Sequence, residues 1–439
     1  MDFLSLLIVL LIGILGYVYW VQGLVSGLIS AVLAIIAALM AISFTEPVID
    51  TLLGGRMADT AYAMVLCALF AGVYLILRVI VDKLVPGNAR FPAIVDQIGG
   101  AAGGVVSGAM AGGIIAIAAQ TLPLGPAPLG SARYELQSRT QVVVTGDRGI
   151  RREYAVINEV RGGKLDDANK VGLWLPVDEW VVGLASHASS GPLSGTSDFS
   201  RVYPDMLTEF FASRLGLPSG ARYVALNNDE RTDVTVSAVA TPPPRTALPV
   251  IDGELAAIRP TDAEPLGKTV TPTDDNQFVV VRVRFASSAA DPDNRMRFSP
   301  GAAALVVDGE LHFPIGILED RQVLVRQYID DMLVAAFPGG MTDIDFVYEL
   351  DPASLVRNPE DTTDLRIKRQ AAFRFKRLAR VDLGGKEVLD QLSPDPKAGG
   401  VIRKRDIEAE LAKLIPGRGT QTSGAGQPAT PPAPPPSPE

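Results

Sequence analysis

Residues 96–108 read DQIGGAAGGVVSG, and this stretch says more about the fold than any other part of the chain. Its glycines Gly100, Gly104 and Gly108 recur every four residues, so a helix places them on one face. A face of small residues lets two helix backbones approach closely in lipid. Asp96 stands at the start of this helix, where the helix dipole favours a carboxylate. The stretch therefore predicts a membrane helix with a closely packed glycine face.

Other apolar stretches precede the glycine-rich one. No charged residue occurs between Asp2 and Glu46. That interval is long enough for two membrane helices, because a bilayer core of ~30 Å needs about 20 residues per helical pass. Gln22-Gly23, just after interfacial aromatic residues, is the natural break between them. We expect four spans, over about residues 3–21, 24–44, 60–81 and 94–120.

Charge divides the chain into a poor and a rich part. Residues 1–122 hold six acidic and four basic residues, whereas residues 123–439 hold 43 acidic and 36 basic ones. The second proportion is ordinary for a soluble domain. The net charge of −9 argues against a nucleic-acid partner, which would favour a basic surface. The sequence thus predicts a membrane domain that has the lipid bilayer as a partner, followed by soluble domains.

Basic residues give the expected orientation of the spans. Lys83 and Arg90 fall between the third and fourth spans, and Arg78 lies near them. The positive-inside rule places this loop in the cytoplasm, so both termini and the soluble part are expected outside. Arg78 and Asp82 are four residues apart, and we expect them to pair at the membrane interface.

The glycine pattern also suggests a family. The spacing Asp96-x3-Gly100-x3-Gly104-x3-Gly108 resembles the signature of the colicin V production (CvpA) family of bacterial inner-membrane proteins. Gly23 and Gly27, at the join of the first two spans, match that family's glycine-marked first turn.

The resemblance covers residues 1–122 only and has two departures. Gln22 and Ser107 stand where the family often has basic residues, so no role of those residues carries over. The resemblance implies a multi-pass protein of the bacterial inner membrane, engaged in colicin V export or envelope homeostasis and without an established catalytic activity. Homo-oligomers through the glycine face are a further expectation.

The soluble part divides into four regions. Residues 123–220 are expected to form a linker and a small mixed α/β region, with helices near 176–187 and from Pro204 to before Gly216. Residues 221–383 show the alternation of short strands, and Asp308-Gly309 lies between apolar runs, as in a hairpin. A linker and short amphipathic helix (384–415) and a Pro-rich disordered tail (416–439) follow.

The predicted fold is therefore multidomain. A four-span α-helical membrane domain precedes a mixed α+β region and an antiparallel β-sandwich resembling immunoglobulin-like domains. Residues 279–285 are expected to form a half-buried strand, and a helix near 322–336 is expected to interrupt the strands.

Residues suited to catalysis are scarce. The only two histidines, His187 and His312, are far apart in the sequence, and the single cysteine, Cys67, lies in an apolar span. The serines match neither a nucleophile-elbow nor a chymotrypsin-like motif. We expect no catalytic, metal-binding or cofactor-binding residue, and no cofactor.

Three functions stay open at this point. The first is a non-enzymatic scaffold or accessory factor in envelope maintenance or toxin secretion, whose β-rich domain contacts a protein or cell-envelope partner. The second is an oligomeric transporter or export channel. The third is a membrane-tethered hydrolase with an unfamiliar site.

Overall fold

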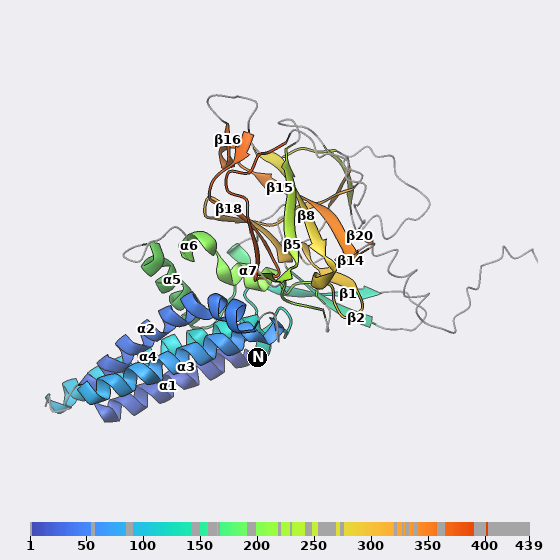
Figure 1. Ribbon diagram of the computed structural model, residues 1–439. Coiled ribbons are helices and arrows are strands. Elements are labelled where there is room, and N and C mark those ends of the chain that lie inside the picture. The colour runs from blue at the N-terminus through green and yellow to red at the C-terminus, as the bar shows by residue number, and fades with distance from the viewer. Residues whose placement is uncertain are drawn as a thin grey trace, which may run out of the picture.

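The computed structural model (Figure 1) shows a helical bundle with β-sheets beyond one of its ends. It describes residues 2–53, 58–84, 91–142, 150–156, 165, 167–190, 199–217, 221–228, 231–241, 248–252, 269–272, 276–319, 323–326, 329, 333–337, 340–357, 365–389 and 401–402. The expected helix at 404–415 and the Pro-rich tail at 416–439 lie outside these residues.

The bundle consists of four long helices. They are α1 (Phe3–Gln22), α2 (Leu24–Val48), α3 (Ala58–Leu84) and α4 (Ala93–Thr121), with a π-helical turn η1 (Ile49–Leu53) after α2. All four are long and apolar enough to cross a membrane, as the sequence predicts. The break falls at Gly23, whose φ of 90° is readily adopted by glycine.

Helix α4 is the central element of the bundle. In its most apolar stretch 67% of residues are buried, against 6% in α3, whose residues are mostly half-buried or exposed. The glycines of α4 explain this position, because a helix without Cβ atoms on several faces can approach more than one neighbour closely.

Short helices and a hairpin connect the bundle to the sheets. They are η2 (Pro128–Gly130), β1 (Leu136–Val142), β2 (Ile150–Val156), η3 (Asp167–Asn169), α5 (Val177–Ser190), α6 (Phe199–Val202) and α7 (Met206–Ala212). Helices α5 and α7 confirm the two helices expected here. Phe210 of α7 joins the apolar core of the bundle, whereas Phe211 joins a cluster with Ala304 and Phe313 of the β-rich region.

The β-rich region begins at Asn227. Its strands are β3 (Asn227–Asn228), β4 (Arg231–Thr232), β5 (Val234–Ala240), β6 (Leu248–Asp252), β7 (Thr269–Val270), β8 (Gln277–Ala286), β9 (Arg295–Phe298), β10 (Ala303–Val307), β11 (Glu310–His312), β12 (Gly316–Glu319), β13 (Val323–Arg326), β14 (Leu333–Ala336), β15 (Met341–Leu350), β16 (Leu355–Arg357), β17 (Leu365–Ile367), β18 (Ala371–Phe375), β19 (Ala379–Asp382) and β20 (Val401–Ile402). The described residues among them also form the 3₁₀ turns η4 (Ser287–Ala289), η5 (Pro300–Ala302) and η7 (Pro352–Ser354).

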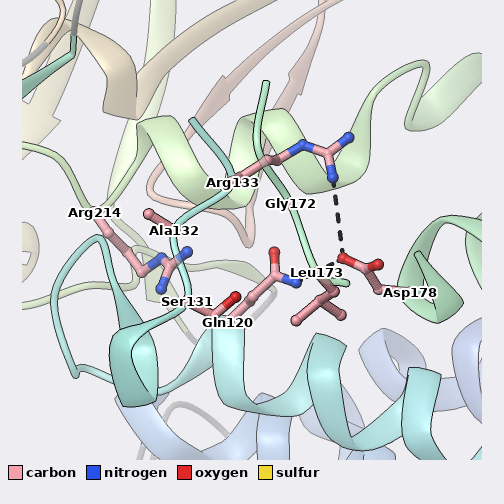
Figure 2. Close-up of a pocket in the computed structure, with 8 residues that line it drawn as sticks. All are labelled: Gln120, Ser131, Ala132, Arg133, Gly172, Leu173, Asp178 and Arg214. Carbon is pink, nitrogen blue, oxygen red and sulfur yellow. Dashed lines mark hydrogen bonds and ion pairs between the residues drawn. The ribbon is translucent and has the colours of Figure 1, made fainter. Parts of the chain in front are cut away.

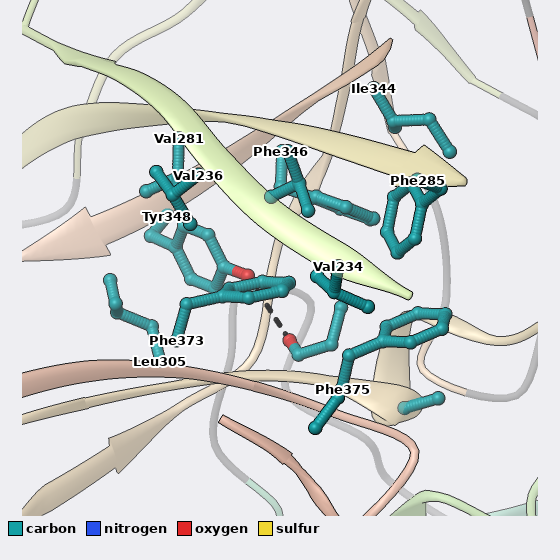
Figure 3. Packing of buried hydrophobic residues seen from close by; sticks show 14 of the residues in the cluster. Val234, Val236, Val281, Phe285, Leu305, Ile344, Phe346, Tyr348, Phe373 and Phe375 are labelled. Carbon is teal, nitrogen blue, oxygen red and sulfur yellow. Dashed lines mark hydrogen bonds between the residues drawn. The ribbon is translucent and has the colours of Figure 1, made fainter. Parts of the chain in front are cut away.

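Three sheets dominate this region. The largest has the order β5-β8-β15-β12-β13-β6-β7, and the others are β11-β10-β18-β19 and β20-β14-β9. Pairing is antiparallel except between β13 and β6, which run parallel. Figure 3 shows side chains of the largest sheet, such as Phe285 and Phe346, packed with Phe373 and Phe375 of the four-stranded sheet. These aromatic rings form the centre of the core.

Two expectations for this region were wrong. Residues 323–326 and 333–336, within the expected helix at 322–336, form strands β13 and β14. Strand β8, expected to be half-buried, is buried on both faces, because Arg282 is covered and pairs with Asp345 at 2.7 Å. The Asp-Gly hairpin is confirmed, with φ of 54° at Asp308 and 82° at Gly309 between β10 and β11.

Candidate functional site: the two ends of the helical bundle

The join of α1 and α2 is closed by a carboxylate from α4. Oδ1 of Asp96 accepts a hydrogen bond of 2.8 Å from the backbone N–H of Leu24, the first residue of α2. A Cβ atom at Gly23 would lie 2.5 Å from Oδ2 of Asp96. Asp96 therefore caps α2 rather than acting only at the start of its own helix, and Gly23 leaves room for it.

The predicted glycine face contacts α1. An added Cβ at Gly100 would lie 2.8 Å from the carbonyl carbon of Gly23, one at Gly104 2.9 Å from the Cα of Gly16, and one at Gly108 2.8 Å from the Cα of Ile12. All three distances are shorter than real Cβ contacts, so the backbones of α4 and α1 touch along the whole face. The face expected to join copies of the chain is thus occupied within one chain.

A second glycine face, which the four-residue spacing does not reveal, contacts α2. An added Cβ at Gly103 would lie 2.8 Å from the Cα of Gly27, and one at Gly27 would lie 2.5 Å from the carbonyl oxygen of Gly100. The predicted Gly27 therefore belongs to this second contact. Doubled glycines in the sequence (99–100, 103–104) are the signal for two faces.

Four hydroxyl groups, one from each helix, meet inside the bundle. Ser30 Oγ lies 2.7 Å from the Tyr19 hydroxyl and 2.6 Å from the Tyr74 hydroxyl, and Ser107 Oγ donates to Ser30 Oγ at 3.0 Å. The two tyrosine hydroxyls are 2.9 Å apart. The hydroxyl groups of this cluster hydrogen-bond one another inside the apolar bundle, and so they fix the helices relative to one another. Sequence reasoning missed it because no two of its members lie on one helix.

The expected pair on α3 forms and extends to α2. Nε of Arg78 lies 3.1 Å from Oδ1 of Asp82. The same guanidinium donates to the hydroxyl of Ser26 at 2.9 Å. Since both partners keep some exposure, the contact is suited to the boundary between lipid and water.

A small polar cavity lies where α4 ends beside α5 (Figure 2). It is lined by Gln120, Ser131, Ala132, Arg133, Gly172, Leu173, Asp178 and Arg214. Nε2 of Gln120 donates to Asp178 at 2.9 Å, and Arg133 lies 4.0 Å from the same carboxylate. Burial raises the pKa of Asp178, while Gln120 and Arg133 oppose that shift. With a volume of about 10 Å³ the cavity has room for a single water, which is far too little for a substrate.

A buried group of charges joins the β-rich region to the bundle. Nε of Arg374 in β18 pairs with Oε1 of Glu209 in α7 at 2.7 Å, and both side chains are at least 96% buried. Arg374 also lies 3.8 Å from the ring centre of Tyr203. Burial raises the pKa of Glu209, and the charge of Arg374 counteracts it.

Arg377, three residues after Arg374, makes the contact to the bundle itself. Nη1 of Arg377 donates to the backbone carbonyl of Thr121, the last residue of α4. At the start of α3, Oδ1 of Asp59 accepts from the backbone N–H of Tyr223 at 2.8 Å. Burial lowers the pKa of Arg377 to about 10, which leaves it charged at neutral pH. Charged and polar bonds therefore fix the β-rich region on two helices of the bundle.

The residues considered for catalysis do not converge. His187 lies near the end of α5, His312 lies in β11 at 3.7 Å from Glu310, and Cys67 lies within α3. Among the described residues no group of three or more His, Cys, Asp or Glu side chains could hold a metal ion. Comparison of the chain with family models, curated proteins and solved structures gave no match.

Proposed function

We propose that the chain is a CvpA-like scaffold of the bacterial inner membrane, with no enzymatic activity of its own. Its four helices anchor an extracytoplasmic β-rich domain, built as a sandwich, that binds a protein or cell-envelope partner. The process served is envelope homeostasis or the production and secretion of a colicin V-type toxin. This proposal rests on the junction between the bundle and the β-rich region, where Arg377 bonds to the end of α4 and Asp59 of α3 bonds to the backbone of Tyr223.

The junction supports a scaffold rather than a tethered domain. A domain that only needs attachment to a membrane is served by a flexible linker. Here the guanidinium of Arg377 is buried against the last turn of α4, and Asp59 holds the backbone at Tyr223. Burying a charge is costly unless it is paired, and Nε and Nη2 of Arg377 have no hydrogen-bond partner among the described residues. We infer from this cost that the position of the domain on the bundle matters.

The bundle supports the same function. Its two glycine faces and its hydroxyl cluster tie α4 to most of α1 and to the first two turns of α2. A transporter needs two arrangements of its helices, and closely touching backbones oppose such a change. The export-channel alternative therefore gains no specific support from these contacts.

Cysteine labelling tests the anchor and its orientation. In a Cys67→Ser background, Ala353→Cys places a thiol on an exposed turn of the β-rich domain, and Asn88→Cys places one between α3 and α4. We expect a membrane-impermeant maleimide added to spheroplasts to label position 353 only. Labelling of position 88 alone would reverse the orientation and overturn the extracytoplasmic role.

Variants of the junction test the scaffold role. In a strain that lacks the wild-type gene, the Arg377→Met variant should fail to restore a normal envelope, because the domain loses its fixed position. The variant protein should still insert in the membrane. Arg297→Met is the matched control, since Arg297 pairs with Asp291 and Asp293 within the β-rich domain. A junction variant that fully complements would contradict the proposal. If the double variant His187→Ala/His312→Ala fails to complement while Arg377→Met complements fully, the hydrolase alternative is favoured.

A further inference from the structure

Residues 171–185, which follow the β1–β2 hairpin and include most of α5, expose large apolar side chains next to the bundle. Trp174 is 64% exposed, Trp180 49% and Leu175 36%. On the opposite side of the segment, Leu173, Val177 and Val181 are buried in the apolar core of the bundle. The segment thus has one face on the helices and one apolar face, the Trp174–Leu175–Trp180 face, directed away from them.

Two contacts give the depth of this segment along the bundle. The backbone N–H of Trp174 donates to Oγ of Ser5, in the first turn of α1, at 3.1 Å. An added Cβ at Gly113 would lie 2.5 Å from the carbonyl oxygen of Val177, and Gly113 is eight residues before the end of α4. At 1.5 Å per residue, the segment reaches about 12 Å down from the end of α4.

That depth coincides with the expected boundary of the hydrocarbon. Helix α1 has 20 residues and is therefore about 30 Å long, which equals the thickness of a bilayer core. A residue bonded to the first turn of α1 lies at the edge of that core. Figure 1 shows α5 beside the bundle.

The carboxylates of the segment are paired, and Asp178 is buried. Its carboxylates between residues 171 and 185 are Asp178 and Glu179. Asp178 accepts from Gln120, and Glu179 lies 2.8 Å from Nζ of Lys170 and 3.3 Å from Arg133. The outer face is consequently left to tryptophan and leucine, and tryptophan is the residue enriched at membrane–water interfaces.

We infer that the Trp174–Leu175–Trp180 face lies in the outer interface of the phospholipid bilayer. The inference rests on the membrane anchor of the proposed function. The occupant is lipid because Trp174 bonds to Ser5, and Phe3 and Leu6 on the same turn of α1 also expose their apolar side chains. The segment is thus a second, interfacial membrane contact, which resists tilting of the β-rich domain relative to the bilayer.

Tryptophan fluorescence tests this inference, because the chain has only three tryptophans. Single-tryptophan proteins retain Trp174 (Trp20→Phe/Trp180→Phe), Trp180 (Trp20→Phe/Trp174→Phe) or Trp20 (Trp174→Phe/Trp180→Phe). The full chain is reconstituted in phosphatidylcholine vesicles whose acyl chains carry bromine near the headgroup or near the bilayer centre. Trp174 and Trp180 should lose more emission to the shallow bromines than to the deep ones, and should resist aqueous iodide.

Trp20, in α1, separates the two proposals. If bromolipids quench Trp20 but leave Trp174 and Trp180 open to iodide, the anchor stands and the interfacial contact is refuted. If Trp174 and Trp180 escape both quenchers, protein covers the face, for example a second copy, and the inference is overturned. If no tryptophan responds to bromolipids, the membrane anchor itself fails. Should a double variant misfold, Trp174→Phe and Trp180→Phe singly give the same readings by difference from the wild type.

Discussion

Replacement of Gly104 by alanine tests the close contact of α4 with α1. The added Cβ would lie 2.9 Å from the Cα of Gly16 and closer still to the carbonyl oxygen of Leu15. Ordinary contacts of a Cβ atom begin near 3.4 Å. Both neighbours are backbone atoms, so no rotamer change relieves the clash. One helix must move away from the other.

The expected loss follows from that movement. Overpacking of a closely packed contact typically costs about 1–3 kcal/mol. Alanine in place of glycine within a helix otherwise gains about 0.5–1 kcal/mol. Gly13→Ala is the matched control, because Gly13 lies in α1 and an added Cβ there meets nothing within 4 Å. We therefore expect Gly104→Ala to lower the free energy of unfolding by about 1–2 kcal/mol and Gly13→Ala to leave it unchanged or raise it.

Reversible unfolding in mixed micelles provides the measurement. The full chain is titrated with sodium dodecyl sulfate, and the loss of helix is followed by circular dichroism for the wild type and both variants. The difference between the two alanine variants is the quantity of interest, since both make the same chemical change. Equal stability of the two variants would show that the glycine face does not set the distance between the helices.

Three further variants test the polar contacts. Asp96→Leu removes the cap of Leu24 and should cost about 1 kcal/mol in the same titration, whereas Asp96→Asn should retain most of that stability. Arg374→Met leaves Glu209 buried without its partner and should cost about 3–5 kcal/mol, and Arg374→Met/Glu209→Leu should recover most of it. Burial lowers the pKa of Lys376 from 10.5 to about 8, so the unfolded chain binds more protons between these values and stability should rise with pH there. Lys376→Met should remove that rise, as measured by unfolding at pH values across the interval.

The spans and the glycine face could be predicted because membrane helices follow from composition and spacing alone. A run of apolar residues of sufficient length has few alternatives in lipid, and the four-residue spacing of Gly100, Gly104 and Gly108 determines a face. The hairpin at Asp308-Gly309 was equally local, because the positive φ angles of its turn suit these two residues.

Contacts between distant segments could not be predicted in this way. The position of Asp96 was evident, but its hydrogen bond reaches Leu24, 72 residues earlier in the chain. The stretch at 322–336 contains apolar residues at helical intervals, yet β13 pairs with β6 and β12, and β14 pairs with β9 and β20. Leu333, Val334 and Ala335 of β14 are all buried, so this strand lacks the alternation on which strand prediction depends.

The change in charge near residue 122 is not a limit of the folded core. One apolar cluster contains Ile117 and Ala119 of α4 together with Val177, Val181 and Phe210 from beyond that point. The backbone of α5 packs directly against Gly113 of α4, where an added Cβ would lie 2.5 Å from the carbonyl oxygen of Val177. Arg377 donates to the backbone carbonyl of Thr121, in the last turn of the same helix. A chain cut at residue 122 would therefore expose part of the core of its bundle. The composition of a segment reflects its surroundings, whereas a folded core is defined by the side chains that bury one another. Here one core includes side chains from both sides of residue 122.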